Sequence, residues 1–182
     1  MGSGPPMLLI HSVNAAASAA EVRPLYERYA ATHTVFALDL PGYGFSPRDD
    51  REYSPRLMTD ALHTAADHIG RLCDGTPIDA LAVSLACEYL ARAAVERPAR
   101  WGRIALVSPT GLNGLTPRRG PPCSTREVPR LRAILSASLW AEGLFRLLTR
   151  PGVIRYFLER TFGGKNIDET MWAYDVLTTR HP

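Results

Sequence analysis

A serine that directly follows an apolar, strand-like run is the residue of this sequence best placed to do chemistry. Ser84 stands in the pentapeptide A-V-S-L-A, between the run at 78–83 and a helical pattern. At such a sharp strand-to-helix turn the hydroxyl projects above the sheet edge, and the next backbone N–H can bind an oxyanion. The tight turn needs small neighbours, a need that Ala82 and Ala86 meet. The pattern indicates a nucleophile, although a serine at a helix start is most often only an N-cap.

Two other segments carry turn-forming patterns after apolar runs. Residues 8–13 read L-L-I-H-S-V, a short apolar run that ends in a polar turn. Residues 39–46 read D-L-P-G-Y-G-F-S and follow the apolar run at 35–38. Glycine and proline at this density predict a loop with a fixed backbone course.

These segments, taken in order, resemble the α/β-hydrolase family. L-L-I-H-S-V is similar to the strand and His-Gly turn of that family, and D-L-P-G-Y-G-F-S closely resembles its D-x-P-G-x-G-x-S loop. The resemblance implies that Ser84 is the nucleophile and that the backbone amides of Ser12 or Val13 and of Leu85 form the oxyanion hole. It further implies hydrolysis of an ester, amide or other activated bond through a covalent intermediate, without a cofactor or metal.

The sequence departs from the family pattern at several points. Ser12 stands where the family usually has glycine, and alanines replace both glycines around the nucleophile. In the family, the catalytic acid and histidine follow the serine on later strands. We expect both to be absent from this chain, which resembles a family member truncated at both ends. Beyond residue 108 the only candidates lie in helical patterns: Asp168, Glu169 and Asp175 for the acid, and His181 for the base.

The remaining histidines do not complete a triad. His11 lies beside the oxyanion turn, where the resemblance implies a structural role. His181 is the penultimate residue, and we expect it to be disordered rather than catalytic.

The elements that must position these residues alternate between strand and helix. Apolar runs predict strands at 7–11, 35–38, 78–83 and 103–107. Periodic patterns predict helices at 19–29, 55–72, 85–97, 128–140, 142–149, 151–162 and 167–177. We expect an α/β fold, with a parallel sheet and helices on both faces, and a helical cap. The resemblance places the strands as the family's four central ones, in the order 4-3-5-6. Residues 1–108 would form a partial core and residues 109–182 the cap.

The composition is typical of a globular domain and argues against several other classes of protein. The 182 residues are 46% hydrophobic and 21% charged, with a net charge of +3, as in a globular domain. We find no nucleic-acid motif and no run near the roughly 20 apolar residues of a membrane span, and we expect a cytoplasmic protein. Cys73, Cys87 and Cys123 lack C-x-x-C spacing, which argues against a disulfide framework or a zinc site.

Two expectations concern partners. Apolar residues of the cap segment predict a pocket for a hydrophobic small-molecule substrate, with a membrane-surface helix as the minority interpretation. Four strands with open edges predict self-association or pairing with another segment. Three functions compete: a serine hydrolase with incomplete sequence, a non-catalytic hydrolase-like binding module, and a subunit completed by another polypeptide.

Overall fold

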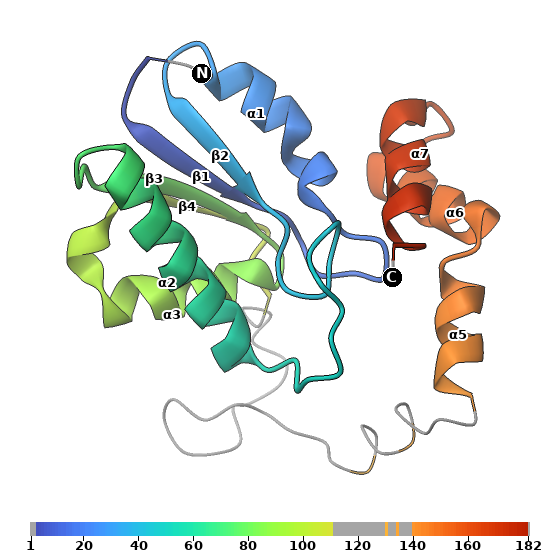
Figure 1. The fold of residues 1–182 in the computed structure, drawn as a ribbon. Coiled ribbons are helices and arrows are strands. Elements are labelled where there is room, and N and C mark those ends of the chain that lie inside the picture. The colour runs from blue at the N-terminus through green and yellow to red at the C-terminus, as the bar shows by residue number, and fades with distance from the viewer. Residues whose placement is uncertain (1–2, 111–129, 131–133, 135–139, 182) are drawn as a thin grey trace.

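The centre of the fold is a four-stranded parallel sheet. The computed structural model describes residues 3–110, 130, 134 and 140–181 (Figure 1). Its strands lie in the order β2-β1-β3-β4, which confirms the predicted arrangement. In chain order they are β1 (Pro6–Ile10), β2 (Thr34–Leu38), β3 (Ile78–Val83) and β4 (Trp101–Val107).

Helices connect and cover these strands. Three belong to the sheet region: α1 (Arg23–Tyr29), α2 (Pro55–Leu72) and α3 (Ala86–Glu96). Short 3₁₀ turns precede α1 and β4: η1 (Ala19–Val22) and η2 (Pro98–Arg100). The helix predicted at 19–29 is thus divided between η1 and α1, with a proline in the first turn of α1. Three more follow β4: α5 (Ala141–Leu148), α6 (Pro151–Phe162) and α7 (Glu169–Thr178). The helix predicted at 128–140 lies almost wholly outside the described residues.

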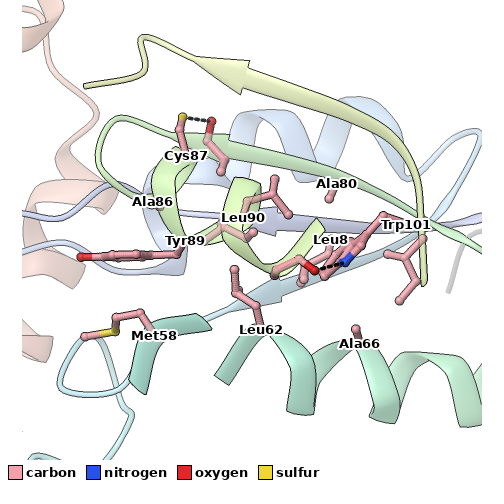
Figure 2. Close-up of a cluster of buried hydrophobic side chains, with 14 of the residues drawn as sticks. Leu8, Met58, Leu62, Ala66, Ala80, Ala86, Cys87, Tyr89, Leu90 and Trp101 are labelled. Carbon is pink, nitrogen blue, oxygen red and sulfur yellow. Dashed lines mark hydrogen bonds between the residues drawn. The ribbon is translucent and has the colours of Figure 1, made fainter. Parts of the chain in front are cut away.

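Alternate residues of the strands face opposite layers, so the helices lie on both faces of the sheet. Leu8 and Ile10 pack into a cluster with α2 and α3, whereas Leu9 packs on the other side, beside η1 and α1. Figure 2 shows the first cluster, in which Leu62 of α2 and Leu90 of α3 meet the sheet. Leu62 and Leu90 are fully buried. Removing an apolar side chain of this size from water contributes about 1.5–3 kcal/mol.

The start of α2 shows how local sequence fixes an element. The Ser54 hydroxyl accepts a hydrogen bond from the Leu57 N–H at 3.2 Å, and Pro55 occupies the first helical position. Met58, Leu62 and Ile69 of α2 are buried, but Leu72 is 57% exposed. At 100° per residue Leu72 lies about 60° around the helix from Ile69, which turns it away from the sheet.

The two outer strands of the described sheet each have one neighbour. On β4, the side chains of Ile104, Leu106 and Val107 are 39–43% exposed, which is high for apolar residues in a parallel sheet. The open edges therefore agree with expectation, while pairing through them stays a prediction. None of the described helices is long and apolar enough to cross a membrane.

The C-terminal helices pack mainly on one another and touch the sheet region through α7 (Figure 1). The Trp172 indole N–H of α7 donates to the Pro151 carbonyl at 3.0 Å, and the Arg155 guanidinium lies 4.6 Å from the Trp172 ring centre. No residue of α5 is buried. The division of the chain at residues 108 and 109 stays a prediction.

Candidate functional site

Ser84 lies on a strained turn between β3 and α3. Its φ is +57°, a left-handed value that residues with a side chain rarely adopt. The Ser84 N–H donates to the Val107 carbonyl at 2.9 Å, which holds the turn to the neighbouring strand. Ala82 and Ala86 are fully buried, so larger side chains would not fit beside the turn. Strain of this kind costs about 1–3 kcal/mol and gathers at functional sites.

The segment predicted to supply the oxyanion amides, residues 12 and 13, follows β1 at the same edge of the sheet. Strands β1 and β3 are parallel neighbours, with Ile10 paired to Ala82. Ser12 and Ser84 each lie two residues beyond this pair. Because parallel strands point the same way, the structure brings the two predicted segments to one edge.

The backbone amides near this edge differ in their partners. The Ser12 N–H donates to the Glu21 carboxylate at 2.8 Å. The Val13 and Leu85 N–H groups have no acceptor among the described residues. Leu85 immediately precedes α3, where the helix dipole favours a negative charge. Of the two alternatives drawn from the sequence, the geometry therefore favours Val13 over Ser12 as the partner of Leu85.

His11 ties the oxyanion turn to the D-L-P-G-Y-G-F-S loop. The Leu40 N–H donates to His11 Nε2 at 3.1 Å. Since Nε2 accepts, Nδ1 carries the proton and donates to the Ser12 carbonyl at 2.6 Å. His11 is fully buried, and this burial lowers its pKa. Both ring nitrogens are occupied in the neutral form, which suits the structural role implied by the sequence.

Asp39 organises the same loop. Its carboxylate accepts hydrogen bonds from the Ala19 N–H at 2.7 Å and the Phe45 N–H at 3.0 Å, and its carbonyl accepts from the Ser46 hydroxyl at 2.7 Å. Gly44 has a φ of +54°, and a Cβ there would come within 2.1 Å of the Asp39 carboxyl carbon. These contacts explain why the motif has an aspartate at position 39, a glycine at position 44 and a serine at position 46.

Each of the three candidate acids interacts with a residue other than Ser84 or a histidine. Asp168 caps α7 by accepting from the Thr170 N–H at 2.8 Å, and Glu169 pairs with Arg155. Asp175 is buried and accepts from the Ser18 hydroxyl at 3.4 Å. Burial is the main cause that raises the pKa of Asp175 to about 7; the Ser18 hydrogen bond lowers it, and nearby Glu21 raises it further.

The candidate base is not part of a triad either. His181, which we expected to be disordered rather than catalytic, packs against the loop: its ring centre lies 5.2 Å from that of Phe45, and its carbonyl accepts from Arg48 at 3.0 Å. Its Nδ1 atom is buried without a hydrogen-bond partner in the described part of the chain. Across that part, no histidine or carboxylate is hydrogen-bonded to the Ser84 hydroxyl.

A cavity of about 450 Å³ lies between the oxyanion turn, the D-L-P-G-Y-G-F-S loop and the C-terminal helices. Val13 and Tyr43 line it from the sheet region, and Phe145 and Thr178 line it from α5 and α7. Sequence reasoning named no substrate-binding residue. The turn motifs around Val13 and Tyr43 and the apolar pattern of the cap segment, which includes Phe145, were the available signals, whereas Thr178 gave none.

No metal site emerges from the described residues, which contain no group of three or more His, Cys, Asp or Glu side chains able to hold an ion. Cys73 and Cys87 are free thiols, and Cys123 lies outside the described residues. The Cys87 thiol, three residues after Ser84, donates to the Ala82 carbonyl at 3.2 Å.

Comparisons with known proteins agree with this geometry. The model of the alpha/beta hydrolase family matches residues 7–182. A serine hydrolase involved in carbazole degradation, CarC, superposes with a TM-score of 0.69 at 16% identity, over 98% of this chain and 57% of that one. The 2-hydroxy-6-oxo-6-phenylhexa-2,4-dienoate hydrolase of Rhodococcus sp. strain RHA1 gives a TM-score of 0.60 at 20% identity, over 98% and 59%. At 16–20% identity, this structural similarity shows a shared fold and nothing more.

One curated relative matches over a shorter stretch. The dihydrolipoyllysine-residue acetyltransferase component of an acetoin cleaving system from Cupriavidus necator is 41% identical over 85 residues. Those residues are 45% of this chain and 21% of the relative. The chain thus spans somewhat more than half of the two solved hydrolases and about a fifth of this relative.

Proposed function

Because the chain belongs to the alpha/beta hydrolase family, we propose that it carries the nucleophile of a serine hydrolase acting on an ester or similar bond of a hydrophobic small molecule. The observation that carries this proposal is the backbone conformation of Ser84. This residue has a φ of +57° and lies between a buried strand and the start of a helix. A non-glycine residue is kept in such strain where the hydroxyl must project from the turn.

The chemistry follows from the amides around Ser84. Its Oγ attacks the substrate carbonyl, and the N–H groups of Val13 and Leu85 stabilise the oxyanion. The intermediate collapses to an acyl-serine as the leaving group departs, and water then hydrolyses that ester. Serine needs a base to accept its proton, and the family order places the acid and the histidine after the serine. The described residues do not supply this base.

The cavity supports a hydrophobic substrate. Much of its wall is apolar or aromatic: Val13, Ala15, Ala16, Ala17, Tyr43, Tyr53 and Phe145. Its contact with Val13 would place a bound acyl or alkyl group beside the proposed oxyanion amide. In this proposal, α5–α7 act as the cap.

Two alternatives remain, each with its own supporting observation. The lack of a hydrogen-bonded triad among the described residues supports a non-catalytic binding module that retains the turn and cavity. The exposed apolar side chains of β4 support a subunit completed by another polypeptide, or self-association through the open edges. Co-purification with a strand-donating partner would favour this last interpretation.

The test is labelling of the purified chain with a fluorophosphonate probe, read by mass spectrometry. We expect labelling at Ser84, abolished by Ser84→Ala, where a base from outside the described residues activates the hydroxyl. Ser108→Ala is a matched control, because Ser108 also has a positive φ, +49°, at the end of a strand and is exposed. Folded protein that stays unlabelled would contradict an activated nucleophile in this chain and favour the binding module.

A further inference from the structure

One arginine joins the D-L-P-G-Y-G-F-S loop to the last helix. The Arg48 guanidinium donates to three carbonyl oxygens: Gly44 at 3.1 Å, Thr178 at 2.9 Å and His181 at 3.0 Å. The first belongs to the loop, the second to the last residue of α7, and the third to His181, three residues beyond that helix. A single side chain thus bridges segments about 130 residues apart in the sequence.

Of the two acceptors, the Thr178 carbonyl is the last carbonyl of α7, and it also accepts from the His181 N–H at 3.1 Å. The last four carbonyls of an α-helix lack intrahelical partners, and the partial negative charge of the dipole gathers there. A planar guanidinium can satisfy several such carbonyls at once, which a lysine ammonium cannot do with the same geometry. Charge-assisted hydrogen bonds of this kind are roughly twice as strong as neutral ones.

Aromatic contacts accompany the bridge. The ring of Phe45, in the same loop, packs edge-on against Tyr174 at 5.6 Å and against His181 at 5.2 Å between centres. Thr178 is 1% exposed, so the end of α7 is buried where Arg48 reaches it. Loop and helix therefore meet through both polar and apolar contacts.

Both sides of this contact line the cavity. Arg48 and Tyr43 come from the loop region, and Thr178 and Thr179 come from the end of α7. We propose that Arg48 is a positioning residue that clamps the C-terminal end of α7 to the loop and thereby fixes one wall of the cavity. The effect on ligands rests on the substrate cavity of the proposed function, whereas the clamp itself does not.

The experiment compares Arg48→Met, Arg48→Lys and Arg51→Met in the full chain. Arg51 is a matched control three residues further along the chain; it pairs with Asp49, and no hydrogen bond joins it to the described residues of α7. Peptide-resolved hydrogen exchange is measured in α7 and in α2. We expect exchange in α7 to rise at least about tenfold in Arg48→Met and by less in Arg48→Lys, with α2 unchanged and Arg51→Met like the parent.

Binding of Nile red, an uncharged apolar dye, then tests the cavity wall. We expect its affinity to fall several-fold in Arg48→Met and to be retained in Arg51→Met. Unchanged exchange in α7, or equal loosening of α7 and α2 in both Arg48 variants, would overturn the clamp. Loosening of α7 with unchanged dye affinity would overturn its role as a cavity wall. If Arg48→Met releases α7 but Ser84 of the parent chain is not labelled, the proposed function is contradicted and the clamp is not.

Discussion

The region up to β4 and the C-terminal helices are held in different ways. In the first, residues such as Leu9, Ile10 and Leu62 are completely buried between sheet and helices. In the second, large apolar side chains such as Phe145, Phe157 and Phe162 are 40–57% exposed. The first region is stabilised chiefly by a continuous core, whereas α7 relies on a small number of specific contacts with the first.

This difference bears on the proposed reaction. The turn at Ser84 and the Val13 amide belong to the densely packed region, which can hold reacting groups in fixed positions. The cavity wall formed by α5 and α7 belongs to the sparsely packed one. We infer that chemistry and substrate selection depend on regions of unequal rigidity, so mutations in the two regions should have separable effects.

The largest contrast is expected from truncating one side chain in each region. Leu62→Ala removes a fully buried side chain from between α2 and the sheet, which typically costs about 2–5 kcal/mol of unfolding free energy. Phe157→Ala removes a side chain of α6 that is 57% exposed, and we expect a change within about 0.5 kcal/mol. Urea titration measures both, and equal losses would contradict the comparison.

A second prediction separates steric crowding from backbone strain in the loop that joins the regions. Gly44→Ala would bring a Cβ to 2.1 Å from the Asp39 carboxyl carbon and displace the group that organises the loop. We expect a loss of about 2 kcal/mol or more. Gly75→Ala is the matched control: Gly75 has a φ of +73°, yet a Cβ there meets nothing within 4 Å.

That control should cost only the backbone penalty of about 1 kcal/mol. Thermal melts compare the two variants. Fluorophosphonate labelling of Ser84 should also slow in Gly44→Ala, because Asp39 holds the start of η1, whose Glu21 binds the Ser12 amide. Equal stability and equal labelling in the two variants would show that the Asp39 contact does not matter.

The packed region was largely predictable from sequence, for physical reasons. The run at 78–83 matches β3 at both ends, because a short apolar stretch between a turn and a helix start has few alternative structures. The Ser54 cap and Pro55 at the start of α2 act locally, and the helix predicted at 55–72 matches α2 at both ends. The strand order came from the family resemblance, and the structure confirms it.

Contacts between side chains and distant backbone groups were not predictable in the same way. The pairing of Ser12 with Glu21, and of Arg48 with the end of α7, joins side chains to backbone groups at distances in sequence that no periodicity reports. The helical pattern around Asp175 did not indicate burial, yet the residue is 7% exposed. Its neighbour Ser18 lies 157 residues earlier, so only the folded arrangement reveals the environment of this carboxyl.

The smallest effect is expected from pH, through the ionisation of Asp175 in α7. Burial raises the pKa of Asp175 to about 7 in the folded chain, whereas an unfolded aspartate titrates near 3.9. The folded state therefore binds this proton more tightly than the unfolded state does. The contribution of the protonated carboxyl to stability is fully present below about pH 4. Stability falls as the pH rises towards 7, since Asp175 must then ionise among apolar groups with only the Ser18 hydroxyl as donor and Glu21 nearby.

We expect docking of α7 to weaken between pH 5 and 8, with its amide exchange, after correction for the intrinsic pH effect, rising more than that of α2. Asp175→Asn keeps the shape of the protonated acid and should flatten this dependence, raising the melting temperature at pH 8 by roughly 5 °C relative to the parent. Asp50→Asn, at an exposed loop position, is the control and should keep the parent profile. A parent profile retained in Asp175→Asn would assign the pH dependence to other groups. In that case the Arg48 clamp and the Phe45 contacts would hold α7 independently of the charge on Asp175.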